Sequence, residues 1–145
     1  MKCEGAALQN PLVSIVDDDP SIRNSTGRLI RSFGFQAEAF GSAGEFLAFG
    51  NIQNTACLIL DVRMPGMNGL ELQDILSRSH LHIPIVFVTA HASDGEEAQA
   101  ATAGAVDVLR KPVSQEALIN AIQIALGQRR QQETQGPDPE RPGNS

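Results

Sequence analysis

The chain has 145 residues, 41% of them hydrophobic, which predicts a single globular domain with an ordinary apolar core. Its formal net charge of -6 argues against binding nucleic acid or lying on an anionic membrane, because an acidic surface repels both. The two cysteines lack metal or redox spacing, and no apolar stretch is long enough for a signal peptide or a membrane span, so we expect a cytoplasmic protein.

The predicted elements alternate between strands and helices along the chain. Short apolar runs predict five strands, at residues 12–16, 35–40, 57–60, 84–89 and 105–109. Capping residues before amphipathic or alanine-rich segments predict helices that begin near Pro20, Ser42, Asn68, Ser93 and Ser114. This alternation at short connections predicts an α/β fold, with a five-stranded parallel sheet and helices on both of its faces.

The ends of the chain are predicted to differ from the domain between them. Residues 1–11 form an N-terminal arm, and residues 12–127 form the folded domain. The last helix is predicted over residues 114–126, with Ile119 and Ile124 beside its buried stripe and therefore exposed. Residues 128–145 are rich in Gln, Pro and Gly, a composition typical of a disordered tail or linker.

Polar residues follow four of the predicted strands: Asp17 and Asp18, Asp61, Thr89 and Lys111. Because ligands of parallel sheets bind beyond the carboxyl ends of the strands, we expect these side chains to converge. An all-oxygen carboxylate cluster favours a hard cation, Mg²⁺ or in its place Mn²⁺. Lys111 and Thr89 would supply a charge and a donor for phosphoryl oxygens, and Asp61 is the natural nucleophile.

Single polar residues allow more than one interpretation. Asp61 considered alone could be a nucleophile, a metal ligand or a helix cap. Asp19 precedes Pro20 and is interpreted as a helix cap, outside the metal site. His80 and His82 match no zinc motif and are interpreted as solvated loop residues.

Four pieces of sequence carry a family resemblance: Val16-Asp17-Asp18, the stretch from Leu60 to Gly69, Val88-Thr89-Ala90 and Lys111-Pro112. In this order over residues 12–126, they resemble the receiver domain of bacterial two-component response regulators. Further segments, such as Ala103 to Asp107, are similar in sequence to the subgroup of receiver domains that a helix-turn-helix DNA-binding domain usually follows. The resemblance implies a flavodoxin-like receiver fold with strand order 2-1-3-4-5.

The resemblance also implies a role for each residue that matches the motifs. Asp61 would accept a phosphoryl group from a sensor histidine kinase, and the domain would not be an enzyme beyond its own Mg²⁺-dependent autophosphorylation and autodephosphorylation. Asp18, Asp61 and the backbone carbonyl of Arg63 would ligate Mg²⁺ directly, and Asp17 would act through water.

Thr89 and Lys111 would bind the phosphoryl group and act as the switch, with a cis bond between Lys111 and Pro112. Val108 departs from the family, which often has an aromatic switch residue at this place.

Two loop residues are candidates for tuning the lifetime of the aspartyl phosphate. Arg63 and His91 each lie two residues beyond a site residue, on loops that face the predicted pocket. They either control how water reaches the aspartyl phosphate or are ordinary solvated loop residues.

The output of the domain leaves two interpretations. The chain is either the input half of a transcriptional regulator or a stand-alone receiver that acts by protein contact. A phosphorylation-dependent homodimer is expected on the alanine-rich helix before Gly104, the strand at 105–109 and the last helix, with Val108, Ile119 and Ile124 on the output surface.

Rival activities need features that the sequence lacks. A phosphatase of the haloacid dehalogenase type needs a second Asp where Arg63 stands. A nucleotide hydrolase needs a Gly-x4-Gly-Lys-[Ser/Thr] loop. Flavin binding would need aromatic side chains to stack on the ring, and the chain has no Trp or Tyr.

Overall fold

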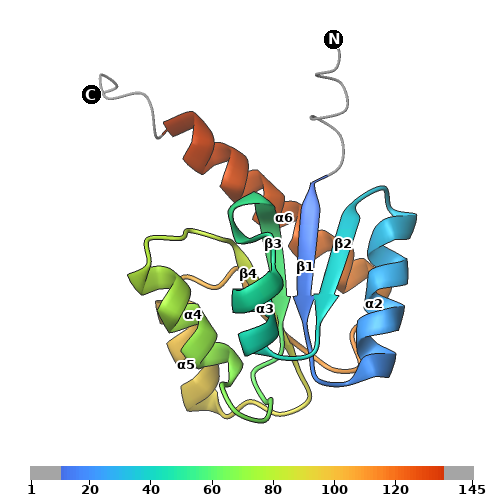
Figure 1. Cartoon of the computed structure of the whole chain (residues 1–145), viewed down its shortest axis with the longest axis vertical. Helices are drawn as coiled ribbons and strands as arrows, with labels where there is room; N and C mark the ends of the chain where they lie inside the picture. The colour runs from blue at the N-terminus through green and yellow to red at the C-terminus, as the bar shows by residue number, and fades with distance from the viewer. Residues whose placement is uncertain (1–10, 136–145) are drawn as a thin grey trace.

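The computed structural model describes residues 11–135, and its centre is one five-stranded sheet (Figure 1). The strands are β1 (Leu12–Val16), β2 (Gln36–Phe40), β3 (Thr55–Leu60), β4 (Ile85–Thr89) and β5 (Asp107–Arg110). All neighbouring strands pair in parallel, in the order β2-β1-β3-β4-β5. The predicted parallel sheet and its strand order are confirmed.

Five α-helices and one short 3-10 helix lie between or after the strands within the described residues: α2 (Pro20–Ser32), α3 (Ala43–Phe49), η1 (Ile52–Asn54), α4 (Gly69–Arg78), α5 (Asp94–Thr102) and α6 (Gln115–Gln135). Side-chain caps set several of their starts. Asp19 accepts from the main-chain N–H groups of Ser21 and Ile22, as its interpretation as a cap requires. Ser93 and Glu96 form a full capping box at α5, and Asn68 forms another at α4.

The helices cover both faces of the sheet and create two apolar layers. On one face, Ile30 of α2 and the inner side of α6 pack on strand residues such as Val13 and Ile59. On the other face, Phe46 of α3 and residues of α4 and α5 pack on Leu58 and other strand side chains. The central strands β1, β3 and β4 are buried along their whole length, so their apolar runs carry no period-two alternation.

Helix α6 differs from its prediction in two respects. Ile119 is buried, at 6% exposure, so its predicted place on the surface is wrong, whereas Ile124 is exposed at 51%. The inner face of α6 is broader than the predicted stripe, because Ile119 and Ala121 also reach the core beneath the helix. The helix also runs to Gln135 instead of ending at Leu126, so the predicted tail does not begin at residue 128.

The remaining differences are local. Strand β5 begins at Asp107 rather than Ala105, because the Ala105 N–H still bonds to Ala100 O at the end of α5. Phe33 is the C-terminal cap residue of α2 and is 51% exposed. Within residues 11–135, no helix is both long enough and apolar enough to cross a membrane. The predicted arm (apart from Pro11) and residues 136–145 of the predicted tail lie outside the described residues.

Candidate functional site

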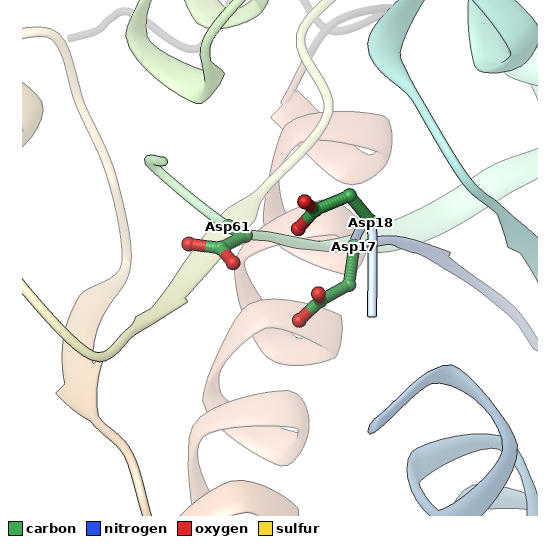
Figure 2. A group of neighbouring side chains, drawn as sticks. All are labelled: Asp17, Asp18 and Asp61. Carbon is green, nitrogen blue, oxygen red and sulfur yellow. The ribbon is translucent and has the colours of Figure 1, made fainter. Parts of the chain in front are cut away.

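Three carboxylates meet where β1 and β3 end. Asp17 and Asp18 follow β1, and Asp61 follows β3, the neighbouring strand. Each offers a carboxylate oxygen, and these oxygens all lie within 4.8 Å of one another (Figure 2). Asp17 and Asp61 are buried, whereas Asp18 is exposed. The structure therefore brings the three predicted acidic residues together, with one side of the cluster open to solvent.

Main-chain hydrogen bonds hold the two buried carboxylates at the sheet edge. The Asp17 N–H donates to Phe40 O, and the Asp61 N–H donates to Val16 O, each over 3.1 Å. These bonds continue the parallel ladders one residue past the strands. In addition, Asp61 Oδ1 accepts from the Arg63 N–H at 3.0 Å, and Asp17 Oδ1 accepts from the Asp19 N–H at 2.9 Å. The backbone thus orients both side chains before any ligand arrives.

Lys111 connects the two buried carboxylates from the end of β5. Its Nζ donates to Asp17 Oδ2 at 2.8 Å and to Asp61 Oδ2 at 3.0 Å, and its side chain is 18% exposed. Its main-chain N–H donates to Thr89 O, and the peptide bond between Lys111 and Pro112 is cis, as the resemblance implied. The ammonium group therefore offsets part of the negative charge of the cluster.

The pKa values of this pair reflect burial and mutual charge. Burial raises the pKa of Asp61 above its ordinary value, although the hydrogen bonds from Lys111 and the Arg63 N–H act in the opposite direction. Burial alone would lower the pKa of Lys111, but its bonds to Asp17 and Asp61 raise it above the ordinary value. The site therefore favours the charged form of Lys111 and disfavours the ionised form of Asp61.

Thr89 is at the same edge of the sheet, but its hydroxyl is engaged with its own loop. The side chain is fully buried, and Oγ1 donates to His91 O at 3.0 Å and accepts from the His91 N–H at 3.3 Å. A hydroxyl has a single hydrogen. This hydrogen can reach a phosphoryl oxygen only after the bond to His91 O is broken.

Arg63 and His91, the two candidates for tuning, are in direct contact. Arg63 Nε donates to His91 O at 3.3 Å, and its Nη2 donates to Glu96 Oε1 at 2.7 Å. The contact uses the main chain of His91 and not its imidazole. Arg63 thus ties the loop after β3 to the loop after β4 and to the first turn of α5, beside the cluster.

The residues predicted for the output surface lie away from this cluster. Val108 pairs with Phe87 in the ladder of β4 and β5 and is half-buried. Ile124 is on the outer side of α6, and Ile119 belongs to the core beneath that helix. The structure therefore leaves Ile124 and part of Val108 as accessible members of the predicted surface.

Sequence reasoning missed three features of the site. The first is Arg23, whose Nη1 donates to Asp17 O at 2.8 Å. The second is Glu96, which completes the capping box of α5 and also binds Arg63. The third is a cavity of about 300 Å³ between α2 and α6, which Asp17, Asp61 and Lys111 border on one side. Of these three, only Arg23 had a signal in the sequence, because it stands a few residues after the acidic loop of residues 17–19.

The fold and the site correspond to a known family. Residues 13–123 match the model of the response regulator receiver domain, and the chain belongs to this family. Such domains form the signal-receiving part of two-component response regulators, and the chain shares their phosphoacceptor fold.

The chain is similar to about half the length of several curated proteins, one of them named as a response regulator. The chain is 43% identical over 119 residues to nodulation protein W of Bradyrhizobium diazoefficiens, covering 82% of this chain and 52% of that protein. It is 40% identical over 126 residues to response regulator protein TodT of Pseudomonas putida, covering 87% and 56%. The chain thus spans about half the length of these curated relatives.

Solved structures show the same fold. The structure of the response regulator StyR has a TM-score of 0.83 and 39% identity, over 91% of this chain and 67% of that one. The FixJ-N crystal structure has a TM-score of 0.75 and 36% identity, over 83% of this chain and 96% of that one.

Proposed function

We propose that this chain accepts a phosphoryl group on Asp61 from a sensor histidine kinase and thereby switches an output surface. One observation carries the proposal. Asp61 is buried at the carboxyl edge of the sheet, grouped with two further carboxylates and only 3.0 Å from a lysine ammonium. A nucleophile, candidate cation ligands and a positive charge for phosphoryl oxygens are thus at one place.

The residues present fit a magnesium ion. The donors are all oxygens, which Mg²⁺ prefers, and Asp18 leaves the cluster open to solvent for the water ligands that the ion retains. We assign Asp18, Asp61 and the Arg63 carbonyl as direct ligands. Asp17 would act through water. When bound, the cation would neutralise charge on the carboxylates and on the incoming phosphoryl group. Mn²⁺ would serve in its place.

The proposed transfer is an in-line displacement at phosphorus. An Asp61 carboxylate oxygen forms a bond to phosphorus while the bond between phosphorus and the kinase's imidazole nitrogen breaks. The electron pair of that bond returns to the imidazole, and Asp61 becomes an acyl phosphate. A later attack by water returns the carboxylate and free phosphate. The same site would take phosphate from a small-molecule donor, which gives the autophosphorylation and autodephosphorylation expected of the domain.

Thr89 and Lys111 would convert the new charge into a change of conformation. The phosphoryl group offers acceptors that compete with His91 O for the Thr89 hydroxyl, and Lys111 is already within reach of Asp61. Moving Thr89 would shift the loop between β4 and α5, and with it the neighbouring surface. We expect a stabilisation of the active arrangement on the order of 1 to 3 kcal/mol. Val108, small at the place of the usual aromatic switch residue, would allow this movement without a ring flip.

For the output, we propose that the chain is the input half of a transcriptional regulator. The support comes from the relatives, among them a protein named transcriptional regulatory protein FixJ, which is 35% identical over 120 residues. We expect no direct nucleic-acid binding by these residues, given their net charge of -6. The alternative is a receiver that acts alone by protein contact. In either case, phosphorylation would drive a homodimer through α5, β5 and α6, where Ile124 is exposed.

The central proposal is tested by intact-mass measurement. The wild type and Asp61→Asn are incubated with acetyl phosphate and Mg²⁺, and the same reactions are run with a chelator. The wild type should gain the mass of one phosphate only when Mg²⁺ is present, and Asp61→Asn should gain none. A wild type that stays unmodified, or an Asp61→Asn variant that gains phosphate equally, would contradict the proposal.

A further inference from the structure

Arg23 binds the acidic loop from the first turns of α2. Its side chain is half-buried, and its Nη1 donates to the main-chain carbonyl of Asp17 at 2.8 Å. The same residue is part of the helix that Asp19 caps, because the Arg23 N–H donates to Asp19 O. One end of Arg23 is therefore fixed in the helix, and the other end is fixed on the loop that leads into it.

The carbonyl that Arg23 binds belongs to the peptide unit between Asp17 and Asp18. A peptide unit is planar, so holding its oxygen fixes the orientation of the whole unit, including the N–H of Asp18. The direction in which the Asp18 side chain leaves the backbone depends on that orientation. Asp18 is also the exposed member of the carboxylate cluster, so the surrounding core does little to hold it in place.

The guanidinium group is packed into a corner that a glycine creates. A Cβ at Gly41, on the turn after β2, would be 3.2 Å from Arg23 Nη1 and 3.6 Å from Glu45 Oε1. The Gly41 N–H itself donates to Glu45 Oε1 at 2.9 Å. Arg23 therefore lies between two loops, one after β1 and one after β2, and its position is defined on both sides.

We propose that Arg23 is a positioning residue for the cation site: by holding the peptide between Asp17 and Asp18, it keeps the three carboxylates converged before the cation binds. The inference rests on the magnesium site of the proposed function. Arg23 itself would not touch the ion. Because Arg23 already restrains the loop, the loop loses less conformational entropy when the ion binds.

The direction in which Mg²⁺ affinity changes on removal of Arg23 separates a positioning role from an effect of its charge. A guanidinium group near the cluster repels a divalent cation, so a role through charge alone predicts tighter Mg²⁺ binding when Arg23 is removed. A positioning role predicts the opposite, because the carboxylates of the variant no longer converge. The two effects cannot be confused in a measurement of affinity.

The same helix supplies a matched control. Arg31 also donates from its guanidinium group to a main-chain carbonyl, from Nη2 to Ala37 O at 3.1 Å. Ala37 is the second residue of β2, whereas the cluster lies beyond the far end of the neighbouring strand β1. Arg31→Ala removes the same type of bond and the same charge from α2 without touching the acidic loop.

The experiment measures Mg²⁺ affinity by following backbone amide shifts of residues 17, 18 and 61 during a titration at constant ionic strength. The full chain is used as wild type, Arg23→Ala, Arg23→Lys and Arg31→Ala. We expect about tenfold weaker binding for Arg23→Ala, in the range of lost supporting contacts at metal sites. Arg23→Lys should recover part of the affinity by donating one bond, and Arg31→Ala should stay within about twofold of the wild type.

Thermal unfolding in a chelator accompanies each titration, so that a loss of fold is separated from a loss of affinity. Unchanged or tighter binding in a folded Arg23→Ala variant would overturn the inference, as would equal weakening in Arg31→Ala. A wild type that shows no Mg²⁺-dependent shifts would overturn the metal site itself, and this result is distinct from the other two.

Discussion

Lys111 Nζ lies 3.0 Å from Asp61 Oδ2 and 2.8 Å from Asp17 Oδ2, so one ammonium group joins the ends of three strands. Two buried carboxylates with oxygens within 4.8 Å of each other would repel strongly without a cation. The lysine supplies that cation within the chain itself. The stability of the domain and its response to Mg²⁺ are therefore linked through this one side chain.

The first prediction concerns Lys111→Met, which keeps the apolar stem and removes the charge. In a chelator, we expect the free energy of unfolding to fall by about 1 to 2 kcal/mol, because Asp17 and Asp61 lose their shared partner. Added Mg²⁺ should recover more stability in this variant than in the wild type. Chemical denaturation with and without Mg²⁺ measures both effects.

The control for Lys111→Met is Arg110→Met, one residue earlier. Arg110 pairs with Glu97 on the surface, and such exposed pairs contribute no more than about 1 kcal/mol. A similar loss in both variants, or no extra recovery by Mg²⁺ in Lys111→Met, would show that Lys111 does not offset the carboxylate charge.

The second prediction is that Asp61→Asn stabilises the domain at neutral pH in the absence of metal, because Asn carries no charge to bury. Burial raises the pKa of Asp61 above the value of 3.8 for an unperturbed group. The folded state then holds this proton more tightly than the unfolded state, so wild-type stability falls as pH rises from 3.8 through the folded pKa. Asn has no such proton, and the two stability curves should separate across this window. Curves that run parallel from acid to neutral pH would contradict the prediction.

The third prediction tests whether Arg63 limits the access of water to the aspartyl phosphate. Arg63→Ala breaks the bonds to His91 O and Glu96, which opens a path for water, and we expect loss of the aspartyl phosphate to be about threefold faster. Glu96→Gln provides a comparison, because Gln still completes the capping box but carries no charge. The decay of phosphorylated protein after removal of the donor gives the rates. A rate that stays unchanged even in the double variant Arg63→Ala/His91→Ala would refute a tuning role.

The fourth prediction concerns the proposed dimer. Ile124 is a large apolar side chain on the outer surface of α6, so Ile124→Glu should prevent phosphorylation-dependent association without changing phosphorylation of Asp61. Phe49→Glu is the matched control, since Phe49 is 80% exposed but belongs to α3 on the other side of the sheet. Light scattering after addition of acetyl phosphate and Mg²⁺ reports the molar mass. A dimer that forms equally in Ile124→Glu would exclude this face.

The fifth prediction is an alkaline loss of stability caused by Cys57. Burial raises the pKa of this thiol from 9.0 to about 12. Between these values the unfolded chain loses the thiol proton and the folded protein keeps it, so the free energy of unfolding should decrease as pH rises, by at most about 1.4 kcal/mol per pH unit. In a Cys3→Ser background, Cys57→Ala should reduce this slope between pH 9 and pH 11. An unchanged slope would rule out Cys57 as the source.

The local features of the fold were predictable because they depend on neighbouring residues. Apolar runs that end in polar residues marked the strands, and the caps at Asp19, Asn68 and Ser93 marked helix starts. The meeting of Asp17, Asp18 and Asp61 also followed from the sequence, since the carboxyl ends of parallel strands share one edge of the sheet.

Other features depend on contacts between distant segments and were decided only by the tertiary structure. Ile119 is buried because α6 lies broadly on the sheet, and a helical pattern alone does not state how wide the covered face is. The engagement of Thr89 with His91 O, the bridge from Arg63 to Glu96 and the bond from Arg23 to the Asp17 carbonyl are choices among side-chain rotamers. Long flexible side chains reach many acceptors, and only the packed neighbours select one of them. The sequence therefore determines which residues the site contains, whereas the tertiary structure determines the hydrogen-bond partner of each side chain.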